Sequence, residues 1–346
     1  MKKKLIIFFS LFLFILLLFS IWVYYILFDS HKSLHNDQNI TVIVKSGMSV
    51  GQIANLLYDK NLIYKTKDFI WGAKLMGTAN KLKAGRYEIP KGKNNYHIIK
   101  LLDLGKISSI RVVIPEGIDS RKISSLLAHN LGIDSLKLIS YVDDSVFIHS
   151  MNIPGISLEG YLFPETYDFY WGQDEESVIK RMVNQFIEVV PDSILRISKI
   201  NPKQFNEIIT LASIIQGEAI VAEEMPIISG VYTNRLKRRM LLQADPTLQY
   251  IIEDGPRRLT NKDKKIQSPY NTYLYLGLPP GPINNPGLNA ILSAANPRKV
   301  PYLYFVANGD GTHTFSRTLN EHLNAKRKFD KIRREVYRKQ RLEKTN

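Results

Sequence analysis

The sequence contains no cysteine among its 346 residues. This absence excludes disulfide bonds and cysteine-bound metal ions, and it is compatible with an oxidising compartment. The chain also lacks a P-loop, a dinucleotide-binding glycine pattern and a Gly-x-Ser-x-Gly turn, which removes the common nucleotide-binding enzymes and serine hydrolases. His31 and His35 have the i, i+4 spacing of some zinc sites but lack the glutamate of a metalloprotease helix. No metal and no cofactor is therefore expected.

Acidic residues are scarce relative to basic ones: 32 Asp and Glu stand against 47 Lys and Arg, for a formal net charge of +15. Much of the excess lies in residues 326–344, a run typical of a solvated basic helix. Alternatively, this run has a function and is attracted to an anionic polymer or to the anionic surface of the cell envelope. Nucleic acid is not expected as a partner, because basic residues are not interleaved with aromatic ones and the N-terminus indicates export.

The N-terminus carries one long apolar run. Residues 5–28 are almost uninterrupted Leu, Ile, Phe, Val and aromatic residues, enough to span a hydrocarbon core of roughly 30 Å. Lys2, Lys3 and Lys4 precede the run, so the positive-inside rule places the N-terminus in the cytoplasm and the bulk of the chain in the periplasm or outside the cell membrane. A cleaved signal peptide is the alternative, but the run is long for one and no small-x-small site follows it.

The length and a hydrophobic fraction of 45% allow two or three domains. After a polar linker at residues 29–39, residues 41–44 alternate like a strand. A turn then leads into a helix with apolar residues at Ile53, Leu56 and Leu57.

A weak repeat of this strand–turn–helix pattern begins at residues 114–117. Residues 84–89 predict a strand that closes the first unit. A strand–helix–strand unit of this size resembles a LysM-like module, which binds N-acetylglucosamine polymers in other proteins. The alternative is a structural spacer between the membrane and the rest of the chain.

Helices and strands are mixed in the remainder. Amphipathic helices are predicted at residues 177–190, 205–219 and 223–239. A strand is predicted at residues 300–306, followed by a hairpin through residues 308–316. Because regular βαβ alternation is missing, we predict an α+β fold, with a transmembrane helix, a small LysM-like βα module and a mixed α+β domain.

Glu218 is the most informative single residue. It ends an apolar helical run and lies three, four and seven residues after Ile215, Ile214 and Leu211, on the same face. Burial there would raise the pKa of the carboxyl group and keep it protonated near neutral pH, ready to donate a proton as a general acid. A buried glutamate satisfied by a cation or by backbone amides is the structural alternative.

Several segments together resemble one family, the endolytic murein transglycosylases (YceG-like). The segments that carry the resemblance are residues 157–167, 211–219, 242–247, 270–273, 277–283, 301–307 and 313–315. The family usually carries acids at the positions of Gln216 and Glu218; this chain has glutamine at the first, so the resemblance assigns the catalytic role to Glu218. It implies a peptidoglycan lytic transglycosylase that works beside peptidoglycan synthases (penicillin-binding proteins).

Such an enzyme cuts the MurNAc-β-1,4-GlcNAc bond within nascent glycan strands. One carboxyl group suffices, because the C6 hydroxyl of the muramic acid attacks internally and leaves a 1,6-anhydroMurNAc end. A muramidase that uses water would need a second carboxylate, either Asp245 or Glu159. A non-catalytic peptidoglycan-binding scaffold of the cell-wall synthesis machinery is the alternative from another class.

Polar and aromatic residues in these segments are the predicted substrate contacts, although turn formation alone would also explain several of them. They are Gln243, Asp245, Thr247, Tyr270, Asn271, Thr272, Tyr273, Pro280, Gly281, Ile283 and His313. Glu159 and Glu165 are expected to hold their loop by hydrogen bonds. The predicted divisions are a tail (1–4), an anchor (5–28), a linker (29–39), LysM-like and related units (40–150), a catalytic domain (151–325) and a basic helix (326–346).

Overall fold

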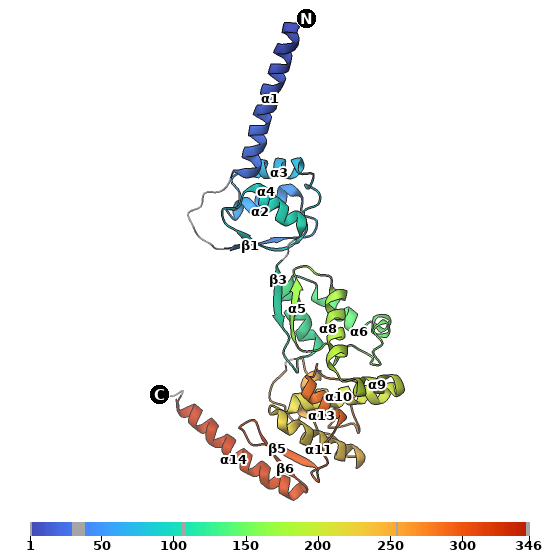
Figure 1. Cartoon of the computed structure of the whole chain (residues 1–346). Coiled ribbons are helices and arrows are strands. Elements are labelled where there is room, and N and C mark those ends of the chain that lie inside the picture. The colour runs from blue at the N-terminus through green and yellow to red at the C-terminus, as the bar shows by residue number, and fades with distance from the viewer. Residues whose placement is uncertain (1, 30–38, 106–107, 254, 344–346) are drawn as a thin grey trace. The chain divides into compact units, whose positions relative to one another are not determined.

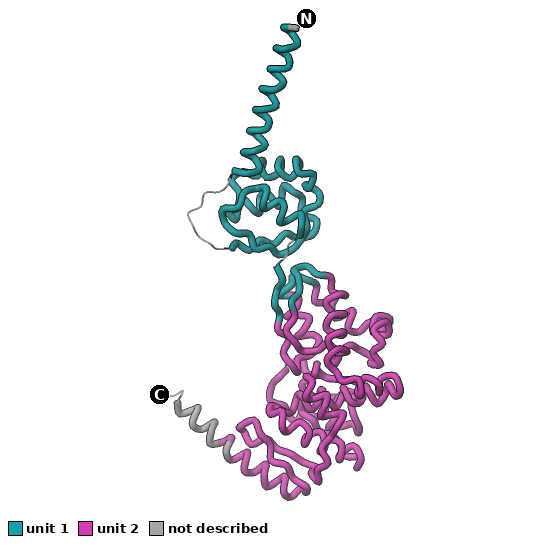
Figure 2. The backbone as a smooth tube through the Cα atoms, in the orientation of Figure 1, with its two compact units in different colours: residues 1–112, 129–133, 168–173 teal, residues 113–128, 134–167, 174–346 magenta. Residues whose placement is uncertain are grey.

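The computed structural model describes residues 2–29, 39–105, 108–253 and 255–343. His31, His35 and most of the predicted linker lie outside these residues. The chain divides into two compact units (Figure 2). The N-terminal unit comprises residues 1–112, 129–133 and 168–173, and the C-terminal unit comprises residues 113–128, 134–167 and 174–346. The fold is mixed α+β and begins with an apolar helix, which confirms the prediction at that level.

The N-terminal unit begins with the helix α1 (Lys2–Phe28), which is long and apolar enough to cross a membrane (Figure 1). Its sheet consists of β1 (Asn39–Val44) paired antiparallel with β2 (Gly85–Pro90). Helices α2 (Val50–Asp59) and α3 (Thr66–Leu75) connect the two strands, and α4 (Asn95–Leu104) follows. The sequence predicted both strands and α2, whereas α3 and α4 were not anticipated.

The last turns of α1 belong to the core of this unit. Ile26 and Leu27 are buried in one hydrophobic cluster with residues of α3 and α4. Asn95 Nδ2 donates a hydrogen bond to the Ile26 carbonyl oxygen (2.9 Å), which satisfies one of the carbonyl groups that a helix end leaves free. A Cβ atom at Gly72 would lie 3.1 Å from Leu27 Cδ2, so the absence of a side chain there permits the close packing of α3.

Two further short sheets and most of the helices follow α4 in the sequence. Strand β3 (Ser109–Val113) pairs with β4 (Thr166–Tyr170), and β5 (Tyr304–Ala307) pairs antiparallel with β6 (His313–Ser316). The helices are α5 (Ser120–Leu131), α6 (Ser135–Asp143), α7 (Ser145–Ser150), α8 (Glu175–Val189), α9 (Asp192–Ile200), α10 (Pro202–Glu218), η1 (Ala222–Glu224), α11 (Met225–Lys237), α12 (Asp245–Ile251), η2 (Asp263–Lys265), α13 (Leu288–Ala295) and α14 (Leu319–Glu343).

Helix α10 is the central element of the C-terminal unit. It contacts α9, α11, α12 and α13, and Figure 1 shows it beside α13. Because other helices surround it, side chains on most faces of its second half are buried. Ile209, Ala212, Ile214 and Ile215 are each 0% exposed. Its C-terminal end therefore projects from a rigid, packed support.

The strand predicted at residues 300–306 is shorter than expected, since β5 begins at Tyr304. Pro301 has no backbone N–H to give to a neighbouring strand. The preceding segment is held instead by Asn234 Nδ2 of α11, which donates to the carbonyl oxygens of Val300 (2.8 Å) and Tyr302 (3.0 Å). Side-chain hydrogen bonds thus replace the first half of the predicted strand.

The burial of Ile26 predicts that its truncation destabilises the N-terminal unit. Ile26→Ala should lower the free energy of unfolding by about 2–4 kcal/mol, because it leaves a cavity in the core. Ile15→Ala is the control, since Ile15 is 56% exposed on the same helix. Hydrogen exchange of the α3 and α4 amides in detergent-solubilised full-length protein measures the effect. Equal protection in the two variants would contradict the packing of α1 into the core.

Candidate active site

Helix α10 fixes the position of Glu218. Asn201 caps the helix, its side-chain oxygen accepting a hydrogen bond from the Gln204 backbone N–H (3.1 Å), and Pro202 occupies the first turn. The helix ends at Glu218, after which Ala219 is extended. The carboxyl group thus extends from the final turn of a buried helix.

The surroundings of Glu218 favour its protonated form. The pKa of Glu218 is raised to about 7, mainly by burial and to a lesser degree by the nearby charge of Asp245. The hydrogen bond from Tyr232 (Oη to Glu218 Oε1, 2.8 Å) and the charge of Arg235 act in the opposite direction. Position in the last turn also disfavours the anion, because this is the negative end of the helix dipole. Near neutral pH, the carboxyl group is therefore poised between donating and accepting a proton.

Tyr232 and Arg235 lie three residues apart on α11 and face this carboxyl group. Burial and the proximity of Glu218 raise the pKa of Tyr232 well above its usual value, so its hydroxyl group remains a donor. Arg235 is held by backbone carbonyl groups: Nε donates to Leu303 (2.6 Å) and Nη1 donates to Leu242 (2.9 Å). Its guanidinium charge is consequently fixed in place.

Two pockets meet at Glu218 and Asp245. The first, of about 360 Å³, is also lined by Gly117, Asp119, Lys122, Gly217, Pro246, Gln249, Tyr250, Pro256, Ile283 and Asn284. The second, of about 470 Å³, is also lined by Tyr232, Arg235, Leu242, Gln243, Lys264, Tyr273, Phe305, Val306, Ala307, His313, His322 and Lys326. Because both carboxyl groups border both pockets, they lie between two hollows rather than at the end of one.

Gly217 allows α12 to approach α10 closely beside the acid. A Cβ atom at this position would lie 2.7 Å from Cβ of Pro246, which is too close for a side chain. The approach brings Asp245, the first residue of α12, next to Glu218. The Tyr273 hydroxyl group donates a hydrogen bond to Asp245 Oδ1 and orients it. The side chain of Asp245 does not cap α12, whose N-cap residue is Ala244.

The structure brings five of the predicted substrate contacts to the pockets: Gln243, Asp245, Tyr273, Ile283 and His313. His313 is anchored, its backbone N–H and ring Nδ1 both bonded to the Glu224 carboxylate (3.0 and 2.7 Å). The other predicted contacts do not line either pocket; they are Thr247, Tyr270, Asn271, Thr272, Pro280 and Gly281.

Buried hydrogen bonds explain what several of these other residues do. Thr272 Oγ1 accepts a bond from the Ala244 backbone N–H (3.0 Å) and lies 2.9 Å from Thr247 Oγ1. Asn271 Nδ2 donates to the carbonyl oxygens of Lys264 (3.2 Å) and Ile266 (2.8 Å). These side chains fix the loops that carry Gln243 and Tyr273, and are themselves screened from a substrate.

Gln216, at the position where the family usually has an acid, holds a loop. Its Oε1 accepts a hydrogen bond from the Gly287 backbone N–H (3.0 Å). Two residues of the adjoining segment bond to Ser213: the Ile283 N–H donates to Ser213 Oγ (3.0 Å), and Asn284 Nδ2 donates to the Ser213 carbonyl oxygen (2.8 Å). One face of α10 thus secures the segment that lines the first pocket.

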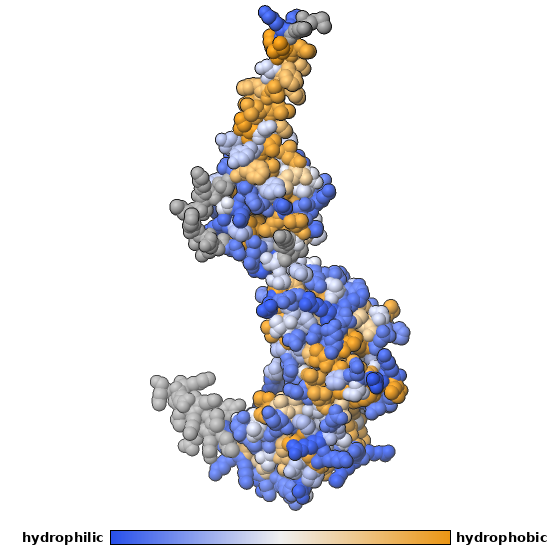
Figure 3. All heavy atoms as spheres, viewed as in Figure 1, coloured by the Kyte–Doolittle hydropathy of each residue, from blue (hydrophilic) through white to orange (hydrophobic). Residues whose placement is uncertain are grey.

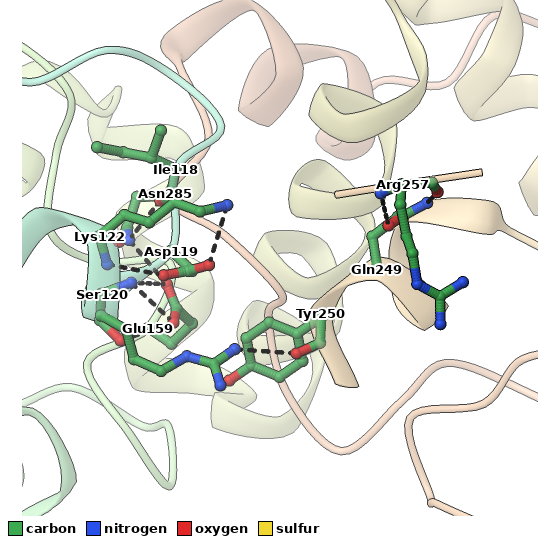
Figure 4. Close-up of polar contacts among 10 residues, drawn as sticks. Ile118, Asp119, Ser120, Lys122, Glu159, Gln249, Tyr250, Arg257 and Asn285 are labelled. Atoms are coloured by element: carbon green, nitrogen blue, oxygen red, sulfur yellow. Dashed lines mark hydrogen bonds and ion pairs between the residues drawn. The ribbon is translucent and has the colours of Figure 1, made fainter. Parts of the chain in front are cut away.

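Glu159 is part of a buried network (Figure 4) whose members Ser120 and Asn285 directly follow Asp119 and Asn284, two lining residues of the first pocket. It accepts hydrogen bonds from the Ser120 backbone N–H (3.1 Å), Ser120 Oγ (2.8 Å) and Asn285 Nδ2 (2.7 Å). Asn285 Oδ1 in turn accepts from the backbone N–H groups of Gly160 and Leu162 (both 2.9 Å). Burial raises the pKa of Glu159 to about 7. The network ties three distant segments together, so Glu159 holds its loop as expected.

Sequence patterns did not single out Tyr232, Arg235, Tyr250 or Asn284 as site residues. Tyr232 lies within the amphipathic helix predicted at residues 223–239, and the signal available there was the need of a buried hydroxyl group for a partner. The other three reach the site through contacts made by distant segments, which no local pattern reveals. Among the described residues, no three His, Asp or Glu side chains are grouped closely enough to hold a metal ion.

Comparison with known proteins identifies the family. The model of the YceG-like family matches residues 42–328. The chain belongs to this family. The endolytic murein transglycosylase of Bacillus subtilis (strain 168) is 34% identical to it over 310 residues, covering 84% of each chain. That of Streptococcus pneumoniae (strain ATCC BAA-255 / R6) is 28% identical over 329 residues, covering 83% of this chain and 59% of the longer relative.

A solved structure also resembles the fold. The crystal structure of a yceG-like protein from Listeria monocytogenes is 32% identical and superposes with a TM-score of 0.58. The match covers 84% of this chain and 99% of the Listeria monocytogenes chain. The resemblance recognised in the sequence motifs is therefore confirmed at the level of the family.

The Glu159 network predicts a stability effect. Glu159→Gln should lower the free energy of unfolding by about 2 kcal/mol, because an amide N–H₂ would face the buried donors of Ser120 or Asn285. Glu165→Gln, an exposed change in the same motif, should cost less than about 0.5 kcal/mol. Chemical denaturation of both variants measures the difference. Equal stabilities would mean that the buried carboxylate does not hold the wall.

Proposed function

We propose that this chain is a membrane-anchored lytic transglycosylase that cleaves the MurNAc-β-1,4-GlcNAc bond within peptidoglycan glycan strands. The supporting observation is that Glu218, with its pKa raised to about 7, lies between two pockets. The activity named for the relatives from Bacillus subtilis and Streptococcus pneumoniae agrees with this chemistry.

The proposed reaction begins with the protonated carboxyl group of Glu218. It donates its proton to the glycosidic oxygen as the bond to the muramic acid anomeric carbon breaks, and the N-acetylglucosamine leaves as an alcohol. Tyr232 holds one carboxyl oxygen (2.8 Å), so the other oxygen is free to face the substrate. The Tyr232 and Arg235 interactions stabilise the carboxylate that forms, which partly offsets the effect of burial.

The second half of the reaction uses the carboxylate as a base. It removes the proton from the C6 hydroxyl group of the same muramic acid, whose oxygen bonds to the anomeric carbon. The product is a 1,6-anhydroMurNAc end, and Glu218 regains its proton. An internal nucleophile needs positioning more than activation, so a second catalytic carboxylate is not required. If water attacked instead, Asp245 would be the partner, because it borders both pockets with Glu218.

The arrangement of the pockets supports an internal cut. A strand that crosses Glu218 has space on both sides of the scissile bond, about 360 Å³ on one side and 470 Å³ on the other. The predicted contacts Gln243, Asp245, Tyr273, Ile283 and His313 would bind the sugars directly. Thr247, Tyr270, Asn271, Thr272, Pro280 and Gly281 would act by shaping the loops.

Anchoring in the cell (inner) membrane through residues 5–28, with the N-terminus in the cytoplasm, is part of the proposal. The burial of Ile26 and Leu27 supports retention of α1, because its removal would expose the core that they fill. The β1-α2-α3-β2 order with an antiparallel strand pair supports a LysM-like module. Peptidoglycan synthases are the proposed partners. Residues 151–325 are the proposed catalytic domain, and Gly117, Asp119 and Lys122 contribute to the first pocket from before it.

The decisive experiment digests uncrosslinked glycan strands with the full-length protein and its Glu218→Gln variant. The amide has nearly the same shape but donates no acidic proton, so cleavage should fall by at least about 10²-fold while the fold is retained. Glu207→Gln, an exposed change on the same helix, should cleave normally. Mass spectrometry of the new ends identifies the nucleophile.

Each outcome has a distinct meaning. Ends lighter by one water than reducing ends support internal attack by the C6 hydroxyl group. Reducing ends would replace the transglycosylase with a muramidase and direct attention to Asp245. Binding without any cleavage by the unmodified protein would favour the scaffold, and normal turnover by Glu218→Gln would refute the assignment of Glu218.

The hydrogen bond from Tyr232 predicts a shift in the pH profile. The first step needs protonated Glu218, so the rate should fall as the pH rises through its pKa of about 7. Tyr232→Phe removes a bond that favours the ionised form, so the alkaline limb should move to higher pH. Tyr275→Phe, whose hydroxyl group bonds to Gln267 away from both pockets, is the control. A shift to lower pH would contradict this electrostatic account.

A further inference from the structure

Helix α1 changes its surroundings along its length. From Leu5 to Trp22 its large apolar side chains are exposed, from 72% at Leu5 to 41% at Trp22. Four residues after Trp22 the helix enters the protein core, where Ile26 is 4% exposed. The exposed part extends about 26 Å at a rise of about 1.5 Å per residue, close to the thickness of a hydrocarbon core. Trp22 thus lies near one edge of the lipid-facing segment, and the exposed aromatic residues Tyr24 and Tyr25 follow it.

Direct contacts place α3 beside Trp22, and the start of α4 beside Ile26 and Phe28, one to two turns further along α1. The rings of Trp22 and Trp71 meet edge to face, with centroids 6.1 Å apart. Phe28 and Tyr96 lie 5.3 Å apart, and the Asn95 amide bonds to α1 at Ile26. Since these contacts lie within one compact unit, the depth of α1 in a bilayer also sets the depth of Trp71 and Tyr96.

The exposed side chains around this junction have the composition of a membrane interface. Trp71 is 50% exposed, and Leu75, one turn later on α3, is 42% exposed. Lys74 Nζ lies 5.3 Å from the Trp71 ring centroid, and Lys100 Nζ lies 5.7 Å from that of Tyr96. Tryptophan and tyrosine favour the headgroup region, and lysine extends to anionic headgroups from it. Figure 3 shows apolar surface continuing from α1 onto the adjoining part of this unit.

We propose that the N-terminal unit rests on the bilayer, with Trp71, Leu75 and Tyr96 in the headgroup layer and Lys74 and Lys100 against anionic lipid phosphates. A flexible connection between α1 and the N-terminal unit would leave the unit free above the membrane. The end of α1 is instead packed into the unit, which fixes the height and orientation of the unit. The inference rests on the membrane anchoring in the proposed function and goes beyond it, because an anchor alone requires no contact between α3 and lipid.

Tryptophan fluorescence tests the proposal, since the chain has three tryptophans. Trp22→Phe combined with Trp171→Phe leaves Trp71 as the sole reporter. Trp22→Phe with Trp71→Phe leaves Trp171, and Trp71→Phe with Trp171→Phe leaves Trp22. Each full-length variant is reconstituted into phosphatidylcholine–phosphatidylglycerol vesicles that contain a lipid with a headgroup spin label, present in both leaflets. Circular dichroism verifies that each variant is folded.

The expected result is strong quenching of Trp22 and Trp71 and several-fold weaker quenching of Trp171. If Trp22 is quenched but Trp71 is quenched no more than Trp171, the proposal is overturned while the anchor remains intact. Absence of quenching at Trp22 as well would overturn the anchoring itself. Phosphatidylcholine-only vesicles provide a second readout: because α1 fixes the depth of both residues, quenching of Trp22 and of Trp71 should persist without anionic lipid. Loss of quenching at Trp71 alone would contradict a height fixed by α1.

Discussion

Withdrawal of the Glu218 carboxyl group from water is the constraint on which the C-terminal unit depends. The group must be desolvated enough to hold a proton, yet it must border a cleft. The chain meets both requirements by ending a buried helix at the acid and placing Tyr232 and Arg235 on the neighbouring helix. Because the opposing influences on the pKa of Glu218 come from fixed groups, the carboxyl group can exchange a proton without rearrangement of its surroundings.

The walls of the cleft are held mainly by buried polar groups. Glu159 and Asn285 join three segments, and Asn271 and Thr272 hold another loop. Each hydrogen bond contributes modestly, but a buried polar group that loses its partner is costly, so such networks define one arrangement sharply. The motif residues that do not line the pockets thus contribute to the site indirectly, because they hold the pocket-lining residues in fixed positions.

Local patterns predicted the features that depend on neighbours in sequence. The apolar run of α1, the amphipathic α8 and the apolar face that ends at Glu218 were all anticipated from spacing. Features produced by distant segments were not. The joining of Ser120, Glu159 and Asn285 and the restraint of residues 300–303 by Asn234 require the fold itself. Helices α3 and α4 were missed although they have the same length as α2, because their apolar residues are less confined to one face.

The attachment of residues 283–287 to α10 has a consequence for biosynthesis. Ser213 and Gln216 hold Ile283, Asn284 and Gly287, which follow them in the chain by about 70 residues. A ribosome adding about 5–20 residues per second makes this partner segment several seconds after the acid-bearing helix. During that interval Glu218 has no finished cleft around it. In the proposed function, a chain that ends before this segment would lack part of the cleft, and the capacity to cut a strand would arise late, as the last third of the sequence folds.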